Sequence, residues 1–463
     1  MSDVSAAAGH VTTRVLAVAD SDSYLKWAAA LLDDLPDRWE RRLVVVRSPI
    51  APTSRQVAAA TTTTGRAGRP PPVVTTRALR RLAERYRPDA LLLACTGPVV
   101  DLLANVTLTG LSRRPVLVSG LPGIAVPASA RAWLYRSSVD LVVVHSLREV
   151  CDVTELGHAL GAAGTVGLAR LPFLSRSGAP GHGVRGEGSR DGPAGAGASR
   201  RDQVVFAVQS LVPARGEDRE RVLRALAALA EQRPDLKVVV KLRSTDGEMQ
   251  THREHLPYRE LWDGLVAAGD VRAGAVVFET GEMRGHLERA AGFVTVGSTA
   301  ALEAIAMSVP LLVLSDFWVS DDLLNVAFEG SGCLGTLADL EKADFRVPDP
   351  GWCARNYFHD ACAATWQDLL VGLLGEARAE RLPEATSLLQ DGASVSRRRR
   401  ARLRLMVPPS LYRVAVRASR WCTRASRRVG RDLRRRPTRG TRTHENTPSR
   451  ATAGVPPPDR GAP

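Results

Sequence analysis

Short apolar runs that alternate with helix-length segments are the feature of this 463-residue sequence that most restricts its fold. Five such runs occur in each half: RVLAVAD, RLVVVR, ALLLAC, PVLVSG and LVVVHS, then VVFAVQ, KVVVKLR, AVVFET, FVTVG and PLLVLS. Strands that are covered on both faces are nearly continuously hydrophobic, and helix-length spacers favour parallel connections between them. The sequence therefore predicts an α/β fold with two Rossmann-like, doubly wound domains, whose carboxyl strand ends face a common cleft.

Composition divides the chain into parts. Residues 175–202 are so rich in Gly, Ser, Ala and Pro that they cannot bury a core, which predicts a flexible linker. We therefore expect an N-terminal Rossmann-like domain over residues 12–174 and a C-terminal Rossmann-like domain over residues 203–375. Residues 376–463 are expected to form an arginine-rich, largely disordered tail.

The net charge of +14 is concentrated in this tail. From residue 396 onward there are twenty arginines, no lysine and three acidic residues, so the rest of the chain carries a net charge of −3. Aliphatic and aromatic residues between the arginines are compatible with a weakly amphipathic helix on an anionic membrane surface. Nucleic-acid binding and a disordered basic extension are the alternatives.

The cysteines do not suggest a metal site or a disulfide framework. They are scattered, without a Cys-x-x-Cys pair or a histidine at zinc-ligand spacing, so we expect reduced thiols. The six are Cys95, Cys151, Cys333, Cys353, Cys362 and Cys422. No run is apolar enough to span a bilayer, and the first residues lack the pattern of a secretion signal. We expect a cytoplasmic protein, with membrane contact at the inner face through the tail as one possibility.

The segment GFVTVGSTAALEAIAMSVPLLVL predicts a strand, a tight turn, a helix and a second strand. Gly297 allows the turn, and Ser298 or Thr299 can cap a helix whose first N–H groups favour an anion. Glu303 lies four residues after Thr299 and therefore shares its helix face. A plain turn with a cap and no ligand is the alternative interpretation.

This segment resembles the nucleotide-sugar-binding unit of GT-B glycosyltransferases and of non-hydrolysing sugar-nucleotide epimerases. The resemblance implies donor phosphate at Ser298 and Thr299, and ribose at Glu303. It also implies that the domain over residues 203–375 binds the nucleotide-sugar and that the domain over residues 12–174 binds the acceptor. Residues 12–375 also resemble a family of actinobacterial proteins catalogued as glycosyltransferases, whose activity is itself inferred. The motifs that carry this resemblance are VVVKLRSTDGEMQTHREHLPY, TVGSTAALEAIAMSVPLLVLSDFWV, LNVAFEGSG and RNYFHD.

Two cations follow the second strand of the C-terminal half. Lys241 and Arg243 stand where a strand end faces the cleft, and they suit a nucleotide leaving group. The position resembles the Lys-x-His-Pro element of bacterial sialyltransferases and polyol-phosphate transferases, although Arg243-Ser244 replaces His-Pro. His252, in the following polar loop, is a candidate for phosphate contact or proton transfer. Solvated surface residues are the alternative for all three.

Four further polar residues of this half are candidate ligand contacts. Glu279 and Glu282 come directly after a strand, where they could bind a base or a ribose edge, or simply begin a helix. Asp316 and Asn325 could close over the sugar, or serve as a cap and a turn former.

In the N-terminal half, Asp20 and Asp22 follow the first strand. A carboxylate there could deprotonate an acceptor hydroxyl, as an inverting transfer requires, or it could cap the first helix. The loop 119–127 is a candidate wall for the acceptor.

These features favour a metal-independent GT-B glycosyltransferase without a cofactor, which uses a nucleotide-sugar as co-substrate. The acceptor is not specified, although cell-envelope glycan or glycolipid assembly would suit a membrane-binding tail. A sugar-nucleotide epimerase is the enzymatic alternative, but it needs more carboxylates around the sugar than the sequence places. A non-catalytic protein that its tail recruits to membrane or nucleic acid is the third possibility.

Overall fold

The computed structural model describes residues 12–61, 65, 68–172, 174, 201–242, 256–320, 323, 325–383 and 386–407. The expected linker and the part of the tail beyond residue 407 therefore lie almost wholly outside the described residues.

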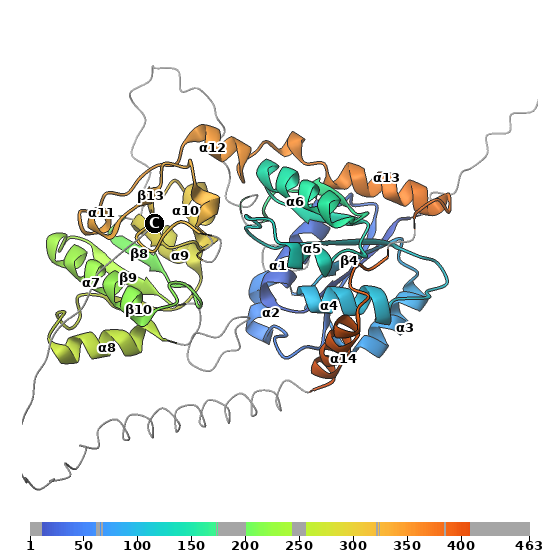
Figure 1. Ribbon diagram of the computed structural model, residues 1–463, viewed down its shortest axis with the longest axis horizontal. Coiled ribbons are helices and arrows are strands. Elements are labelled where there is room, and N and C mark those ends of the chain that lie inside the picture. The colour runs from blue at the N-terminus through green and yellow to red at the C-terminus, as the bar shows by residue number, and fades with distance from the viewer. Residues whose placement is uncertain are drawn as a thin grey trace, which may run out of the picture. The chain divides into compact units, whose positions relative to one another are not determined.

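A seven-stranded parallel sheet forms the first domain, with strand order β3-β2-β1-β4-β5-β6-β7 (Figure 1). Its strands are β1 Arg14–Ala19, β2 Glu40–Val46, β3 Val73–Val74, β4 Ala90–Ala94, β5 Val116–Gly120, β6 Leu141–Val144 and β7 Thr165–Leu168. Its helices are α1 Asp22–Asp34, α2 Ser54–Thr61, α3 Thr76–Tyr86, α4 Gly97–Leu102, α5 Ala130–Leu134 and α6 Leu147–Leu160, with a π-helical turn at Leu103–Thr107. The strand order reverses between β1 and β4, so ligands are expected beside the ends of these two strands.

A six-stranded parallel sheet forms the second domain, with strand order β10-β9-β8-β11-β12-β13. Its strands are β8 Gln203–Ala207, β9 Lys237–Lys241, β10 Val277–Glu279, β11 Ala290–Thr295, β12 Leu311–Leu314 and β13 Leu334–Gly335. Its helices are α7 Gly216–Gln232, α8 Tyr258–Ala268, α9 Met283–Leu287, α10 Ala300–Ala306, α11 Leu337–Glu341 and α12 Pro350–Arg355, with a 3₁₀ turn at Val326–Phe328. All ten predicted strands are present, and the predicted fold class of two doubly wound α/β domains is confirmed.

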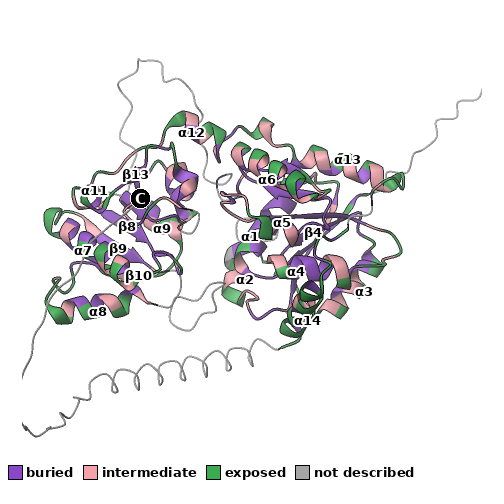
Figure 2. Cartoon of the chain, viewed as in Figure 1, coloured by how far each residue is buried: buried purple, intermediate pink, exposed green. Residues whose placement is uncertain are grey.

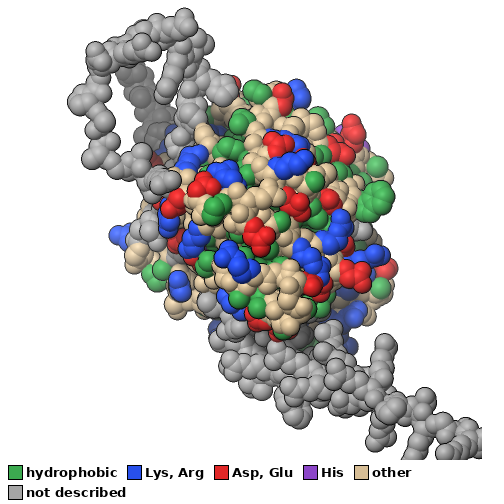
Figure 3. Space-filling model, turned by 90° about the vertical axis from the view of Figure 1, so that its left-hand side faces the viewer, with side chains coloured by type: hydrophobic (Ala, Val, Ile, Leu, Met, Phe, Trp, Pro, Cys, Tyr) green, Lys and Arg blue, Asp and Glu red, His purple; other side chains and the backbone are tan. Residues whose placement is uncertain are grey.

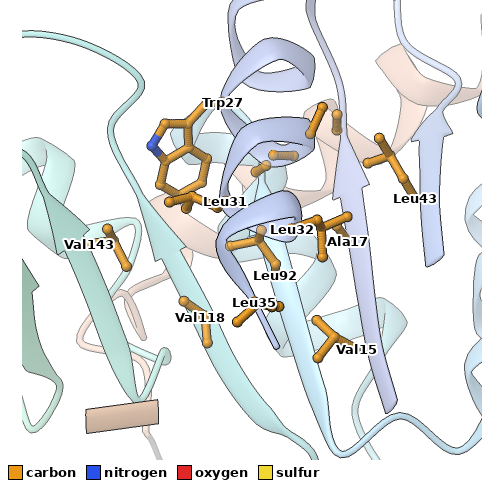
Figure 4. Close-up of a cluster of buried hydrophobic side chains, with 14 of the residues drawn as sticks. Val15, Ala17, Trp27, Leu31, Leu32, Leu35, Leu43, Leu92, Val118 and Val143 are labelled. Carbon is orange, nitrogen blue, oxygen red and sulfur yellow. The ribbon is translucent and has the colours of Figure 1, made fainter. Parts of the chain in front are cut away.

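Each sheet is buried between layers of helices, and the helices are exposed on their outer faces (Figure 2). Helix α1 illustrates the pattern, because Trp27, Leu31 and Leu32 recur at helical spacing and pack against the apolar side chains of β1, β4 and β5 (Figure 4). Its opposite face carries Lys26, which is exposed. Burial of this stripe fixes α1 on the sheet and so fixes the residues at its first turn.

Helix α13, Trp366–Arg378, belongs to the first domain, which differs from the expected C-terminal boundary at residue 375. Trp366, Leu370 and Leu374 lie in the same buried cluster as α1 and the strands of the first sheet. A side chain at Gly167 of β7 would come within 3.0 Å of the Trp366 backbone, so the helix lies directly on the strand. The sequence shows the apolar stripe of α13 but not which sheet it covers.

Helix α14, Gly392–Met406, is ordered and packed, so the expectation of a disordered tail is wrong for this segment. Ala401 and Leu405 are buried in the core beneath α4. Arg398 makes two hydrogen bonds of 2.8 Å to the buried carboxylate of Asp101. Composition misleads here because it treats every arginine as solvated, whereas one of them pairs with a buried acid.

His145, at the end of β6, makes folding sensitive to acid. Its Nε2 accepts a hydrogen bond from the Trp27 indole, and its Nδ1 is 3.0 Å from the Ala169 carbonyl oxygen. Because an indole N–H can only donate, the ring is neutral and carries its proton on Nδ1. Burial lowers the pKa of His145 from 6.5 to about 4.

We expect His145 to reduce the free energy of unfolding as the pH falls from 6.5 to about 4. The unfolded chain takes up the proton first, so the loss approaches roughly 3 kcal/mol. Urea titrations across this range should show a smaller acid loss in His145→Gln, because glutamine can keep both hydrogen bonds without titrating. Equal pH dependence in the two proteins would contradict the assignment.

Candidate functional site

The turn between β11 and α10 has the predicted strand–turn–helix form. The Gly297 N–H donates to Oε1 of Gln209 at 2.8 Å, and the Ser298 N–H donates to Oγ1 of Thr295 at 3.2 Å. The Ser298 hydroxyl accepts from the Ala300 N–H at 3.2 Å, whereas the Thr299 side chain makes no capping hydrogen bond and is exposed. Ser298 is therefore the residue that caps the helix. Gln209, which follows β8, was missed by sequence reasoning because its partner lies 88 residues away.

Glu303 lies half-buried on α10, one turn beyond this entrance. Burial raises the pKa of its carboxyl group, and the nearby positive charges of Lys26 and Lys241 oppose the rise. The structure thus brings together two predicted residues, Glu303 and Lys241, with a lysine from the first domain that the sequence did not single out. Lys26 is also bound to Asp22, four residues earlier on α1, at 2.9 Å.

The first domain approaches the same turn through its loop 119–127. A side chain at Gly123 would lie 3.0 Å from Cγ2 of Thr299, so a glycine allows the loop to approach this closely. The loop that was predicted as an acceptor wall therefore adjoins the turn that was predicted to hold phosphate.

Glu149 anchors this loop. Its Oε1 accepts from the Ala125 N–H and from the Tyr357 hydroxyl, each at 2.7 Å, and its Oε2 accepts from the His145 N–H at 2.8 Å. The Ser146 hydroxyl caps α6 by accepting a hydrogen bond from the Glu149 N–H at 3.0 Å. The Glu149 carboxylate, however, bonds to neighbours distant in sequence, and burial raises its pKa. Tyr357 belongs to the RNYFHD motif, which thus connects the end of the second domain to the loop.

Asp20 is fully buried at the end of β1, beside the switch point of the first sheet. Its Oδ2 accepts from the Thr96 N–H at 2.9 Å and from the Thr96 hydroxyl at 2.5 Å. Its Oδ1 has no hydrogen-bond partner among the described residues. Burial raises the pKa of Asp20, while the bonds from Thr96 and the charge of Arg136 lower it. Asp22 differs, because it begins α1 and its Oδ2 is paired with Lys26.

Arg136 is a buried residue near Asp20 that was not predicted from the sequence. Its guanidinium donates to the Gly120 carbonyl at 3.1 Å and to the Tyr24 hydroxyl at 2.7 Å. Because Gly120 ends β5 and Tyr24 lies on α1, one buried cation ties together elements on either side of Asp20.

The remaining predicted residues occupy different positions. Lys241 is nearly buried at the end of β9, and Arg243 and His252 lie outside the described residues. Glu279 forms an ion pair with Lys237, and its Oε2 lies 3.5 Å from Nδ1 of His286. Glu282 is an exposed residue at the start of α9. Among the described residues, neither glutamate makes a hydrogen bond or an ion pair with the turn at Gly297.

Asp316 and Asn325 bond to backbone groups of their own region. Asp316 accepts from the Leu337 N–H at 2.7 Å, at the start of α11. The Asn325 side chain accepts from the Ser320 N–H and donates to the Trp318 carbonyl at 2.9 Å. These contacts match the cap and turn roles, which were the alternatives to sugar binding.

The loop that Asn325 braces presents a residue that sequence reasoning missed. Trp318 is 82% exposed and has a φ of +78°, a conformation that is rare for a residue with a large side chain. The register of β11 and β12 places the start of this loop level with Gly297. The sequence signal that could have identified Trp318 is a tryptophan in the segment that directly follows a strand.

Two surface hollows lie at the opposite edge of the first sheet. One, of about 290 Å³, includes Arg41, Arg42 and Pro70–Pro72, and the other, of about 530 Å³, includes Arg14, Asp89 and Arg113. Their arginines form ion pairs with neighbouring acids, as in Arg113–Asp89 at 3.1 Å. We place the candidate site at the carboxyl edges instead, because ligands of open α/β sheets bind there.

The described part of the chain lacks a candidate metal site, a membrane-spanning helix and a disulfide bond. Within it, no group of three or more His, Cys, Asp or Glu side chains could hold a metal ion, and no helix is long and apolar enough to cross a bilayer. Five cysteines are free thiols there, and Cys422 lies outside it.

Solved structures with similar folds include two UDP-GlcNAc 2-epimerases. The enzyme from Neisseria meningitidis, bound to UDP-GlcNAc, has 10% identity and a TM-score of 0.46, and covers 79% of this chain and 100% of its own. The enzyme from Methanocaldococcus jannaschii has 9% identity and a TM-score of 0.48, with coverages of 78% and 98%. The spinosyn rhamnosyltransferase has 17% identity and a TM-score of 0.32, with coverages of 88% and 100%. At these values they assign no activity to this chain.

A search of curated proteins found no match. A family model described as "Putative glycosyltransferase (DUF6716)" matches residues 15–373, which include both sheets, the turn at Gly297 and the Asp20 region. Since this match spans most of the sequence and both halves of the candidate site, the chain belongs to that family of putative glycosyltransferases.

Proposed function

We propose that the protein transfers a sugar from a nucleotide-activated donor to an acceptor, with the donor on the second domain and the acceptor on the first. The observation that carries the proposal is the position of Glu303, a half-buried carboxylate one turn beyond the Gly297–Thr299 entrance and close to Lys241 and Lys26. A nucleoside diphosphate matches this arrangement, because its phosphates can bind the two lysines and its ribose hydroxyls can donate hydrogen bonds to the carboxylate.

On the donor side, we assign phosphate to the exposed Thr299 and to Lys241, and ribose to Glu303. Lys241 would stabilise the charge that develops on the nucleotide as it leaves, which is the basis for a transfer without a metal or a cofactor. Arg243 and His252 remain predicted contributors to the same step.

On the acceptor side, Asp20 is the preferred general base. Asp20 and Asp22 each have one carboxylate oxygen without a hydrogen-bond partner among the described residues. Asp20 is better suited to take a proton from a hydroxyl group, because burial raises its pKa, whereas Asp22 is paired with Lys26. The loop 119–127 would position the acceptor, since it adjoins Thr299.

Transfer is favoured over epimerisation by the same contacts. An epimerase needs several carboxylates around the sugar, and Glu279 and Asp316 are engaged with Lys237, His286 and the start of α11. We further propose a cytoplasmic enzyme that makes peripheral contact with an anionic membrane, in cell-envelope glycan or glycolipid assembly, and that does not act on nucleic acid.

Nucleotide binding should depend on the entrance and on Glu303. Ser298→Phe is expected to abolish it, because the larger side chain removes the cap and fills the phosphate position. Glu303→Ala should weaken it by about 1.5–3 kcal/mol, the cost of a hydrogen bond to a charged group. Isothermal calorimetry with UDP, GDP, CDP, CMP and dTDP, after a thermal-shift screen, is the measurement.

Glu231→Ala is the matched control, because Glu231 is an exposed carboxylate of the same domain at the end of α7. It should leave the affinity unchanged. If the wild-type chain binds none of these nucleotides, or if Ser298→Phe and Glu303→Ala bind as tightly as the wild type, the proposed donor site is wrong.

A further inference from the structure

The inward face of α14 holds this helix firmly on the first domain. Arg398 donates to both carboxylate oxygens of Asp101, to the Ser387 hydroxyl at 2.7 Å and to the Leu389 carbonyl at 2.9 Å. Ala401 and Leu405, three and seven residues later, are buried on the same side. Its opposite side therefore has a fixed orientation relative to the domain (Figure 1).

The outward face combines arginines with apolar side chains. Arg399, Arg400 and Arg402 are exposed. Val395, Leu403 and Met406 lie among them with exposed fractions of 58%, 57% and 50%. At 3.6 residues per turn, these six side chains spread over roughly half of the helix circumference, outside the stripe of Arg398, Ala401 and Leu405, and we call this exposed surface the α14 outer face.

The charge on this face is of one sign, because α14 contains no aspartate or glutamate. The surface of the second domain is different, since acidic and basic side chains alternate across it (Figure 3). Pairs such as Arg224–Asp270 and Arg233–Asp235, each at 2.8 Å, neutralise charge there.

We propose that the α14 outer face is a docking surface for an anionic membrane, on which the helix lies parallel to the bilayer. Arginines attract acidic lipid headgroups, and exposed Leu and Met side chains gain free energy on entering the acyl boundary. Nucleic-acid phosphates would use the arginines but would leave the three apolar residues without a partner. Charge and apolarity together therefore favour a lipid surface.

The docking surface deepens the membrane contact named in the proposed function and rests on it, but it does not depend on the proposed sugar transfer. It places the contact on a folded element of the first domain rather than on the chain beyond residue 407, and so it specifies which surface of that domain faces the lipid.

Co-sedimentation of the full chain with vesicles tests the proposal. One series contains a third phosphatidylserine or phosphatidylglycerol, the other only phosphatidylcholine, and each is measured at low and high salt. Arg399→Gln/Arg400→Gln/Arg402→Gln should bind the anionic vesicles on the order of a hundredfold more weakly, since each arginine near such a surface contributes roughly fivefold. Leu403→Ser/Met406→Ser should lose about tenfold.

The matched control is Arg38→Gln/Arg55→Gln/Arg272→Gln, which removes the same charge from three exposed arginines on other elements. It should bind like the wild type. Thermal unfolding of every variant checks that the fold is retained, and the two α14 variants test the face independently.

Fourteen further arginines follow residue 407 and remain in every variant. If either α14 variant binds anionic vesicles as tightly as the wild type, the outer face is not the docking surface. The proposal is also overturned if the wild-type chain fails to bind anionic vesicles, or if it binds double-stranded DNA or RNA more tightly than vesicles under the same conditions.

Discussion

A chain that ends at residue 395 should unfold at a much lower urea concentration than one that ends at residue 407. The shorter chain loses Arg398, so the buried Asp101 carboxylate is left without its cation. Removing one partner of a buried ion pair costs about 3–5 kcal/mol. Loss of the buried Leu405 side chain adds about 2–5 kcal/mol. Circular dichroism during urea titration should show the first domain unfolding early.

Substitutions separate the ion pair from the packing. Arg398→Met alone should destabilise the first domain, whereas Arg398→Met/Asp101→Leu should recover much of the loss, because the carboxylate is no longer buried unpaired. Arg399→Met, next to it on the exposed side, is the control and should have little effect. Equal urea midpoints for the chains ending at 395 and 407 would show that α14 does not stabilise the fold.

Asp20→Asn is expected to lower sugar transfer by about 10²- to 10⁴-fold while leaving the fold and nucleotide affinity intact. Asparagine can still accept both hydrogen bonds from Thr96, but its amide cannot take a proton from a hydroxyl group. Turnover is measured as nucleotide released from the sugar nucleotide that best stabilises the protein.

The matched control is Asp22→Asn, because Asp22 lies two residues from Asp20 and is paired with Lys26. It should retain most of the activity. In the wild type, turnover should also fall as the pH drops through the raised pKa of Asp20, because only the carboxylate is a base. Normal turnover by Asp20→Asn would exclude this residue as the base.

Much of the fold follows from local sequence pattern. Ten apolar runs became strands because their hydrophobic continuity matches burial on both faces of a parallel sheet. Strands β3 and β13 have two residues each, which is too short for any pattern to reveal. The partners of α13 and α14 were not predictable either, since an amphipathic helix does not specify the sheet that it covers.

The candidate site was predictable where one segment contains several of its parts. Gly297, Ser298 and Glu303 lie within seven residues, so their order alone indicated a helix entrance with an acid one turn later. Gln209 and Lys26 reach the same region from distant segments, and nothing near them in the sequence indicates it. Asp316 and Asn325 were predicted as ligand contacts, but they bond to backbone groups. Polar residues after a strand cap a helix or brace a turn as often as they bind a ligand.

The return of α13 and α14 to the first domain has a consequence for how the chain folds during synthesis. The buried clusters of the second domain are complete once Tyr357 has been made, but those of the first domain still lack Leu374 and Leu405. On the ribosome, the domain translated first is therefore the one finished last. Until about residue 405 emerges, its sheet has apolar surface that a chaperone must shield or that neighbouring nascent chains can contact.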